Sequence, residues 1–103
     1  MSRQLLIDTF DPSFHIGRSE DPVTALEFVE AVKDSVKHQK PFGSHDAMAA
    51  LIRSVASELI HNNPRWSGAE WLEAMIGEAT ELWVAEYAVR TQRMSFSMMM
   101  MPL

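Results

Sequence analysis

The chain has 103 residues, a formal net charge of -5 at pH 7, a hydrophobic content of 47% and no cysteine. This composition favours one globular domain and argues against wholesale disorder. The lack of cysteine excludes disulfides, thiol nucleophiles and thiolate metal sites, and the acidic balance gives no electrostatic reason to bind nucleic acid or anionic lipid.

The first ten residues lack the features of a secretory signal. They contain one basic residue, Arg3, and only a short apolar run. No apolar stretch approaches the ~20 residues that a membrane-spanning helix needs. We therefore expect a cytoplasmic protein that does not enter the membrane.

Residues 3–18 contain two short apolar runs, at 4–7 and 14–16, on either side of the turn-forming residues 11–13. Proline fixes the backbone for such a turn. Because both runs are short and lack clean alternation, they predict extended structure of one of two kinds. Either a short β-hairpin or an irregular arm across the helices fits the pattern.

A first helix is predicted from about residue 22 to 38. Asp21 can accept a hydrogen bond as its N-cap, and Pro22 suits the first helical position. Apolar residues spaced by three or four form one face, and they are Val23, Leu26, Val29, Val32 and Val36. Phe28 falls off this face, which predicts a contact outside the core of the monomer.

A second helix is predicted over residues 44–62. Ser44 is its expected N-cap, and the sequence Asn-Asn-Pro at 62–64 ends it. The predicted buried face consists of Met48, Leu51, Ile52, Val55 and Leu59.

A third helix is predicted over residues 67–92. Ser67 and Glu70 have the spacing of a capping box, and Trp66 and Trp71 that of a hydrophobic staple. Further on, apolar residues run almost all round the helix: Leu82, Trp83, Val84, Ala85, Tyr87, Ala88 and Val89. A helix that is apolar on every side must be covered on every side, so we expect a homodimer through this helix.

The last ten residues, 94–103, include five methionines. Methionine is flexible and recurs on surfaces that accept varied partners. We divide the chain into a single helical domain, 1–93, and a Met-rich tail, 94–103. The tail is either a frayed terminus or a segment that docks on a partner or on a sister subunit.

Glu58 and His61 have the Glu-x-x-His spacing of di-iron helical bundles, which also need carboxylates from facing helices. A dimeric metal-binding bundle is therefore one alternative function. However, His61 points away from the predicted buried face, and it lies in the last helical turn, where a cation is favourable for structural reasons. The sequence predicts no bound cofactor.

Helices 44–62 and 67–92, joined by a short turn, also suggest a helix-turn-helix as a second alternative. The residues that would face DNA include Glu70 and Glu73, and no lysine or arginine follows until Arg90. We therefore expect no nucleic-acid partner. No glycine-rich phosphate loop is present, and we expect no enzymatic activity.

The sequence as a whole predicts a mostly α protein: a three-helix domain with a short N-terminal arm or hairpin, forming a homodimer. The expected function is a small protein-binding module, an adaptor, inhibitor or assembly factor that docks on another protein. Tryptophan and tyrosine dominate binding hot spots. The predicted interface residues are Phe28, Leu82, Trp83, Val84, Tyr87, Val89 and Phe96.

Overall fold

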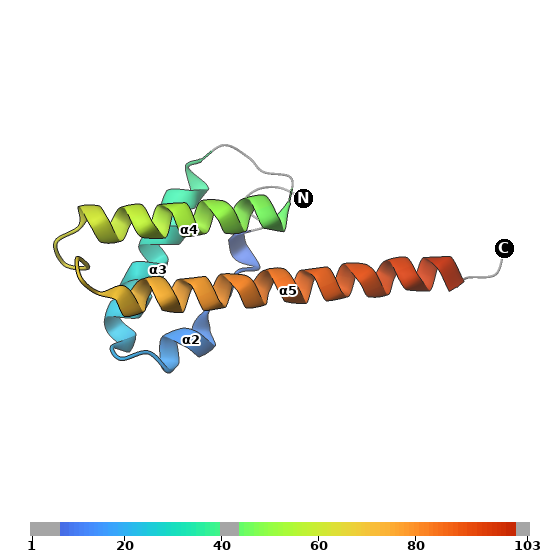
Figure 1. Ribbon diagram of the computed structural model, residues 1–103, viewed down its shortest axis with the longest axis horizontal. Helices are drawn as coiled ribbons and strands as arrows, with labels where there is room; N and C mark the ends of the chain where they lie inside the picture. Colours follow the sequence, from blue (N-terminus) through green and yellow to red (C-terminus); the bar gives the residue numbers. More distant parts are fainter. Residues whose placement is uncertain (1–6, 40–43, 101–103) are drawn as a thin grey trace.

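The computed structural model describes the backbone of residues 7–39 and 44–100, and the side chains of residues 7–39 and 44–87. The described part is mostly helical, as predicted, and contains no strand (Figure 1). Its helices are α2 (Ser13–Gly17), α3 (Pro22–Lys37), α4 (His45–Asn62) and α5 (Glu70–Met100).

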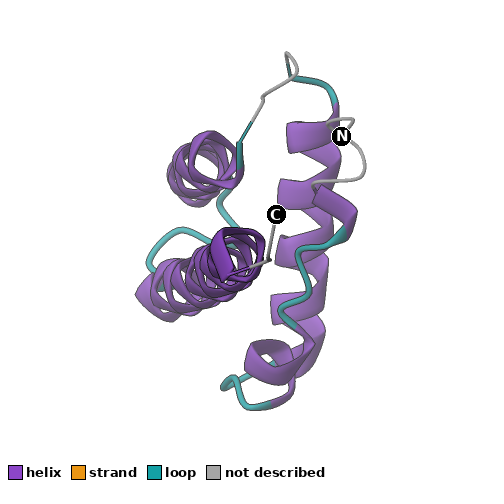
Figure 2. Ribbon diagram, turned by 90° about the vertical axis from the view of Figure 1, so that its right-hand side faces the viewer, coloured by secondary structure: helices purple, strands orange, loops and turns teal. Residues whose placement is uncertain are grey.

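Helices α4 and α5 lie side by side and run in opposite directions, and α3 crosses both of them (Figures 1 and 2). The short helix α2 contacts α3 and α5. The core lies between these elements, and the N-terminal residues Ile7 and Phe10 are buried in it. Within the described residues, no helix has the length and apolar character of a membrane span.

The prediction of extended structure over residues 3–18 is wrong for Ser13–Gly17, which form α2. Residues 3–6 of that segment lie outside the described residues. The predicted turn at residues 11–13 is instead a helix start. The Asp11 carboxylate accepts hydrogen bonds from the backbone N–H and the hydroxyl of Ser13, and these bonds hold the pKa of Asp11 below its ordinary value.

Helix α3 begins where the sequence predicts, because the Asp21 side chain accepts a hydrogen bond of 3.3 Å from the N–H of Thr24. Its buried face is rotated from the predicted one. Val23 is 68% exposed and Leu26 47% exposed, whereas Phe28 is fully buried. The buried residues of α3 are Ala25, Phe28, Val29, Val32 and Val36. The prediction that Phe28 lies outside the core is therefore wrong.

Helix α4 has the predicted bounds and the predicted cap, since the Ser44 hydroxyl accepts a hydrogen bond of 3.1 Å from the N–H of Ala47. Leu51 and Leu59 are only half-buried. The residues of α4 in the core are His45, Met48, Ala49, Ile52, Val55, Ala56 and Ile60. The burial of His45 is a feature that the apolar periodicity does not reveal.

Helix α5 starts at Glu70, three residues after the predicted start, so the predicted capping box is wrong. Gly68 has a φ of +85°, in the left-handed region that favours glycine. This conformation keeps the right-handed helix from starting at Ser67. Trp66 lies in the resulting turn, buried with its ring edge-to-face with Phe28 at 5.2 Å.

The far end of α5 also differs from the prediction. The helix runs without a break across the predicted boundary at residue 93 and ends at Met100. Figure 1 shows its second half extending well beyond the body that the other helices form. Much of the predicted Met-rich tail therefore continues the helix, and residues 101–103 lie outside the described range.

Candidate protein-docking surface on helix α5

A group of aromatic side chains holds α5 to the body at its middle. The indole N–H of Trp83 donates a hydrogen bond of 3.0 Å to the hydroxyl of Thr9, and the ring packs edge-on against Phe10 at 5.4 Å. His45 lies 4.7 Å from the Trp83 ring and stacks on Tyr87 at 3.6 Å. We call Phe10, His45, Trp83 and Tyr87 the anchor cluster. It fixes the position of α5 just before the helix leaves the body.

Two predicted interface residues lie in the core of the monomer. Trp83 is only 8% exposed, and Phe28 is fully buried. The predicted surplus of apolar surface is smaller at these positions because other aromatic rings of the chain cover them: Phe10 packs against Trp83, and Trp66 packs against Phe28. Neither Phe28 nor Trp83 is available to another molecule.

Other predicted interface residues remain on the surface. Leu82 is 52% exposed and Tyr87 45% exposed, and Val84 is half-buried. Val89 and Phe96 belong to the projecting half of α5, but their side chains lie outside the described ones. Leu82 and Tyr87 therefore keep about half of their surface exposed near the point where α5 leaves the body.

One face of α5 is exposed or half-buried along the whole length of the body. Its residues follow each other at helical spacing and form what we call the α5 stripe: Trp71, Ala74, Glu78, Leu82 and Ala85. Glutamates lie beside it, and one of them, Glu81, pairs with Arg53 of α4 at 3.8 Å. The stripe thus combines small and apolar side chains with one carboxylate, that of Glu78, and has further carboxylates beside it.

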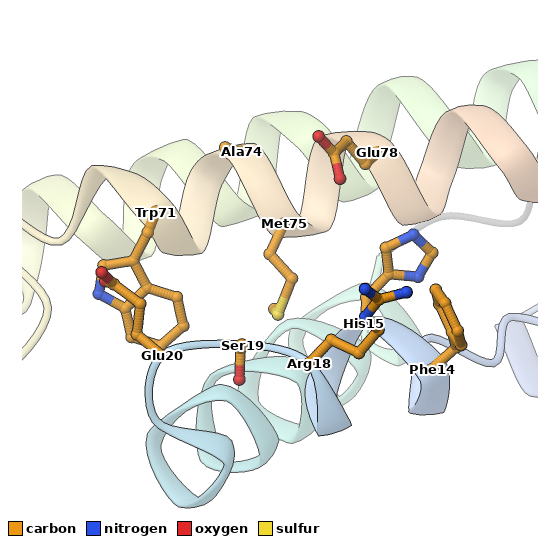
Figure 3. A pocket seen from close by; sticks show the side chains of 9 residues that line it. All are labelled: Phe14, His15, Arg18, Ser19, Glu20, Trp71, Ala74, Met75 and Glu78. Carbon is orange, nitrogen blue, oxygen red and sulfur yellow. The ribbon is translucent and has the colours of Figure 1, made fainter.

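At its N-terminal end the α5 stripe reaches a pocket between α2 and α5, with a volume of about 390 Å³ (Figure 3). Phe14 at its edge is 65% exposed, and the Arg18 guanidinium lies 5.2 Å from the centre of the Phe14 ring. The lining residues of this α2/α5 pocket are Phe14, His15, Arg18, Ser19, Glu20, Trp71, Ala74, Met75 and Glu78. This pocket could not be predicted from the sequence pattern, because residues 13–17 were expected to be extended and instead form α2.

The burial of His45 is a second feature that the spacing of apolar residues does not predict. It is the first residue of α4 and is 5% exposed. Burial lowers the pKa of His45 below its ordinary value of 6.5, and the neighbouring Asp46 carboxylate opposes this effect only in part. The anchor cluster therefore contains a neutral imidazole near physiological pH.

The stability of the fold should depend on pH through His45. The unfolded chain binds a proton near pH 6.5, but the folded chain does so only at lower pH, so the free energy of unfolding should fall as the pH drops below 6.5. Urea unfolding at a series of pH values measures this slope. His45→Gln should remove it and the exposed control His61→Gln should keep it, whereas equal slopes in the two variants would contradict the assignment.

The candidate metal ligands Glu58 and His61 do not lie in a cluster of further ligands from the described part of the chain. Glu58 and His61 are both exposed, and the Nδ1 atom of His61 lies 2.7 Å from the backbone oxygen of Ser57. Among the residues that the structure describes, no three histidine, aspartate or glutamate side chains come together as a metal ion would require. The metal-binding alternative gains no geometric support.

The helix-turn-helix alternative also finds no support in the geometry. A DNA-binding pair of this kind crosses at a steep angle, whereas α4 and α5 lie antiparallel (Figure 1). The first turn of α5 carries the exposed residues Glu70 and Glu73, whose charges repel phosphate. No protein-family model, curated protein or solved structure matches this chain.

Proposed function

We propose that this chain is a protein-binding module that docks on a partner protein through the exposed surface of α5. One observation carries the proposal. The first half of α5 packs in the core and the anchor cluster holds its middle, yet the helix continues to Met100 past the body and leaves Leu82 and Tyr87 about half exposed (Figure 1). The rigid body would present the helix, and the projecting half would make the contact.

The physics of isolated helices supports this role. A helix segment without tertiary contacts is marginally stable in water, because most helical stability in proteins comes from packing. Covering the projecting half of α5 would therefore stabilise it as well as bury apolar surface. The sequence of that half supplies suitable groups, including Val89, Met94 and Phe96, and methionine adapts its shape to the partner.

The distribution of charge supports a specific contact with a partner and not a non-specific hydrophobic association. The exposed carboxylates of Glu78, Glu81 and Glu86 lie along α5 close to Leu82. Charges around an apolar centre fix the register and reject partners of like charge. We propose an adaptor, inhibitor or assembly factor of the cytoplasm that also self-associates through α5, with Leu82, Val84, Tyr87, Val89 and Phe96 as interface residues.

A charge substitution tests this function. In affinity capture from the native host with the full tagged chain, Leu82→Glu should reduce the amount of bound partner about tenfold or more, since burying one leucine stabilises by about 1.5–3 kcal/mol. Val23→Glu is the matched control, because Val23 is equally apolar and 68% exposed, but lies on α3. Equal capture by the two variants would contradict the proposal.

A further inference from the structure

We propose that a second copy of this chain docks along α5 in an antiparallel pair centred on Ala85, with the end of each α5 lying over the α2/α5 pocket of the other copy. This inference rests on the proposed docking role of α5 and names the occupant of that surface. It follows from three properties of α5: its length, its residue spacing and its charge.

The length of α5 is divided evenly by Ala85. The helix has 31 residues, from Glu70 to Met100, so each half spans about 22 Å at the helical rise of ~1.5 Å per residue. The first half lies against the body and the second half projects from it (Figure 1). In an antiparallel pair centred on Ala85, each projecting half runs along the supported half of the other copy, and neither end overhangs.

The positions of the α5 stripe and of its continuation are also arranged symmetrically about Ala85. Continued along the sequence at steps of three and four, it falls on Val89, Gln92, Phe96 and Met99. An antiparallel pairing centred on Ala85 then sets stripe positions against stripe positions. The opposed positions are Trp71 with Met99, Ala74 with Phe96, Glu78 with Gln92, and, to within one residue, Leu82 with Val89. The small side chain at Ala85 lets the two helices approach closely where they cross.

The charges of α5 select the antiparallel direction. All its carboxylates lie in the first part, at Glu70, Glu73, Glu78, Glu81 and Glu86, and its only cations follow, at Arg90 and Arg93. In the antiparallel pairing, Arg90 of one copy faces a position next to Glu81 of the other copy. Arg93 likewise faces a position next to Glu78. A parallel pair would instead set carboxylates against carboxylates, which is destabilising.

The α2/α5 pocket gives the end of the helix a place to bind. In this register, residues 96–100 of one copy lie over residues 70–74 of the other, where Trp71 and Ala74 form one wall of the pocket. Figure 3 shows Trp71 and Met75 of α5 and Phe14 of α2 around this space. Phenylalanine and methionine fit such a lining, because thioethers make favourable contacts with aromatic rings.

Cysteine cross-linking tests the register directly, because the natural chain has no cysteine. Sedimentation of the full chain should give twice the monomer mass, and Leu82→Glu should weaken the pair roughly a hundredfold, about tenfold for each of two leucines. Under mild oxidation, a mixture of Ala74→Cys and Phe96→Cys chains should form a mixed disulfide dimer. Neither variant alone should do so, and Ala85→Cys should cross-link to itself.

Two outcomes would overturn the inference. One is a monomer at every concentration with no mixed disulfide; the other is efficient cross-linking of Ala74→Cys to itself, which indicates a parallel pair. Circular dichroism of each variant checks that it is folded. If the chain is a monomer, and Leu82→Glu loses a captured partner that Val23→Glu keeps, the dimer is overturned and the docking role stands. If the two variants capture equally, the docking role itself is contradicted.

Discussion

Replacing Trp83 with alanine should lower the free energy of unfolding by about 3–5 kcal/mol, the cost of removing a buried aromatic side chain. Trp83 is 8% exposed and contacts both the N-terminal segment, through Phe10 and Thr9, and α4, through His45. Its loss would leave a cavity at the junction of three segments. Urea unfolding followed by circular dichroism measures the change, since the fluorescence of Trp83 itself would be lost.

The variant Trp83→Phe separates packing from hydrogen bonding. It keeps an aromatic ring beside Phe10 and removes the hydrogen bond to Thr9. We therefore expect the free energy of unfolding to fall by about 1 kcal/mol for the hydrogen bond, and by a further part of the packing contribution that Trp83→Ala removes. A loss below about 1 kcal/mol for Trp83→Ala would mean that the anchor cluster does not hold α5. It would also restore Trp83 as a candidate for the docking surface.

Replacing Phe28 with alanine should be equally costly, about 3–5 kcal/mol. Phe28 is fully buried, and its ring packs against that of Trp66 in the turn before α5. The indole nitrogen of Trp66 is buried and has no hydrogen-bond partner among the described residues. Trp66 is therefore held mainly by packing, and removing Phe28 frees it. Urea unfolding measures the loss, and the quenching of tryptophan fluorescence should increase.

Phe28→Ala also distinguishes the core position from the interface role that the sequence suggested. Substituting a core residue lowers the free energy of unfolding and leaves partner capture by the folded protein as in the natural chain. Substituting an interface residue would lower partner capture and leave the free energy of unfolding unchanged. The exposed neighbour Leu26, at 47% exposure on the same helix, is the control, because Leu26→Ala should change the unfolding free energy by no more than about 0.5 kcal/mol. Similar losses for the two variants would contradict the observed face of α3.

The helix starts at Asp21 and Ser44 could be predicted from the sequence because a cap is a local interaction. In each case, the side chain accepts a hydrogen bond from the N–H three residues later, and four or five residues of sequence contain all the participants. The same reasoning failed at Ser67, since the positive φ of Gly68 competes with the helix there. A short motif predicts a cap only where the next residues favour the helical backbone.

The buried face of α3 could not be predicted from apolar spacing alone. Val23, Leu26 and Phe28 are all apolar, and which of them is buried depends on distant neighbours, such as Trp66, which packs against Phe28. The anchor cluster depends on still longer connections, because the hydrogen bond from Trp83 to Thr9 joins residues 74 positions apart. Single-sequence periodicity contains no information about such pairs.

The candidate site could be predicted in part, because some of its features are local and others depend on distant contacts. The excess of apolar residues around α5 is a local property, and it correctly indicated that some of them, Leu82 and Tyr87, remain exposed. The α2/α5 pocket was not predictable, because it needs α2 to fold and to pack on α5. The burial of His45 likewise follows from the approach of α5, through Trp83 and Tyr87.

Site-specific photo-cross-linking at position 82 in the native host tests the central claim most directly, because it records what touches α5 in the intact protein. A photoreactive residue replaces Leu82 in one variant and Val23 in the other. We predict a cross-linked adduct, to a second copy or to another protein, at position 82 and none at position 23. An absence of adducts at position 82, or the same adducts at both positions, would contradict a docking role for α5.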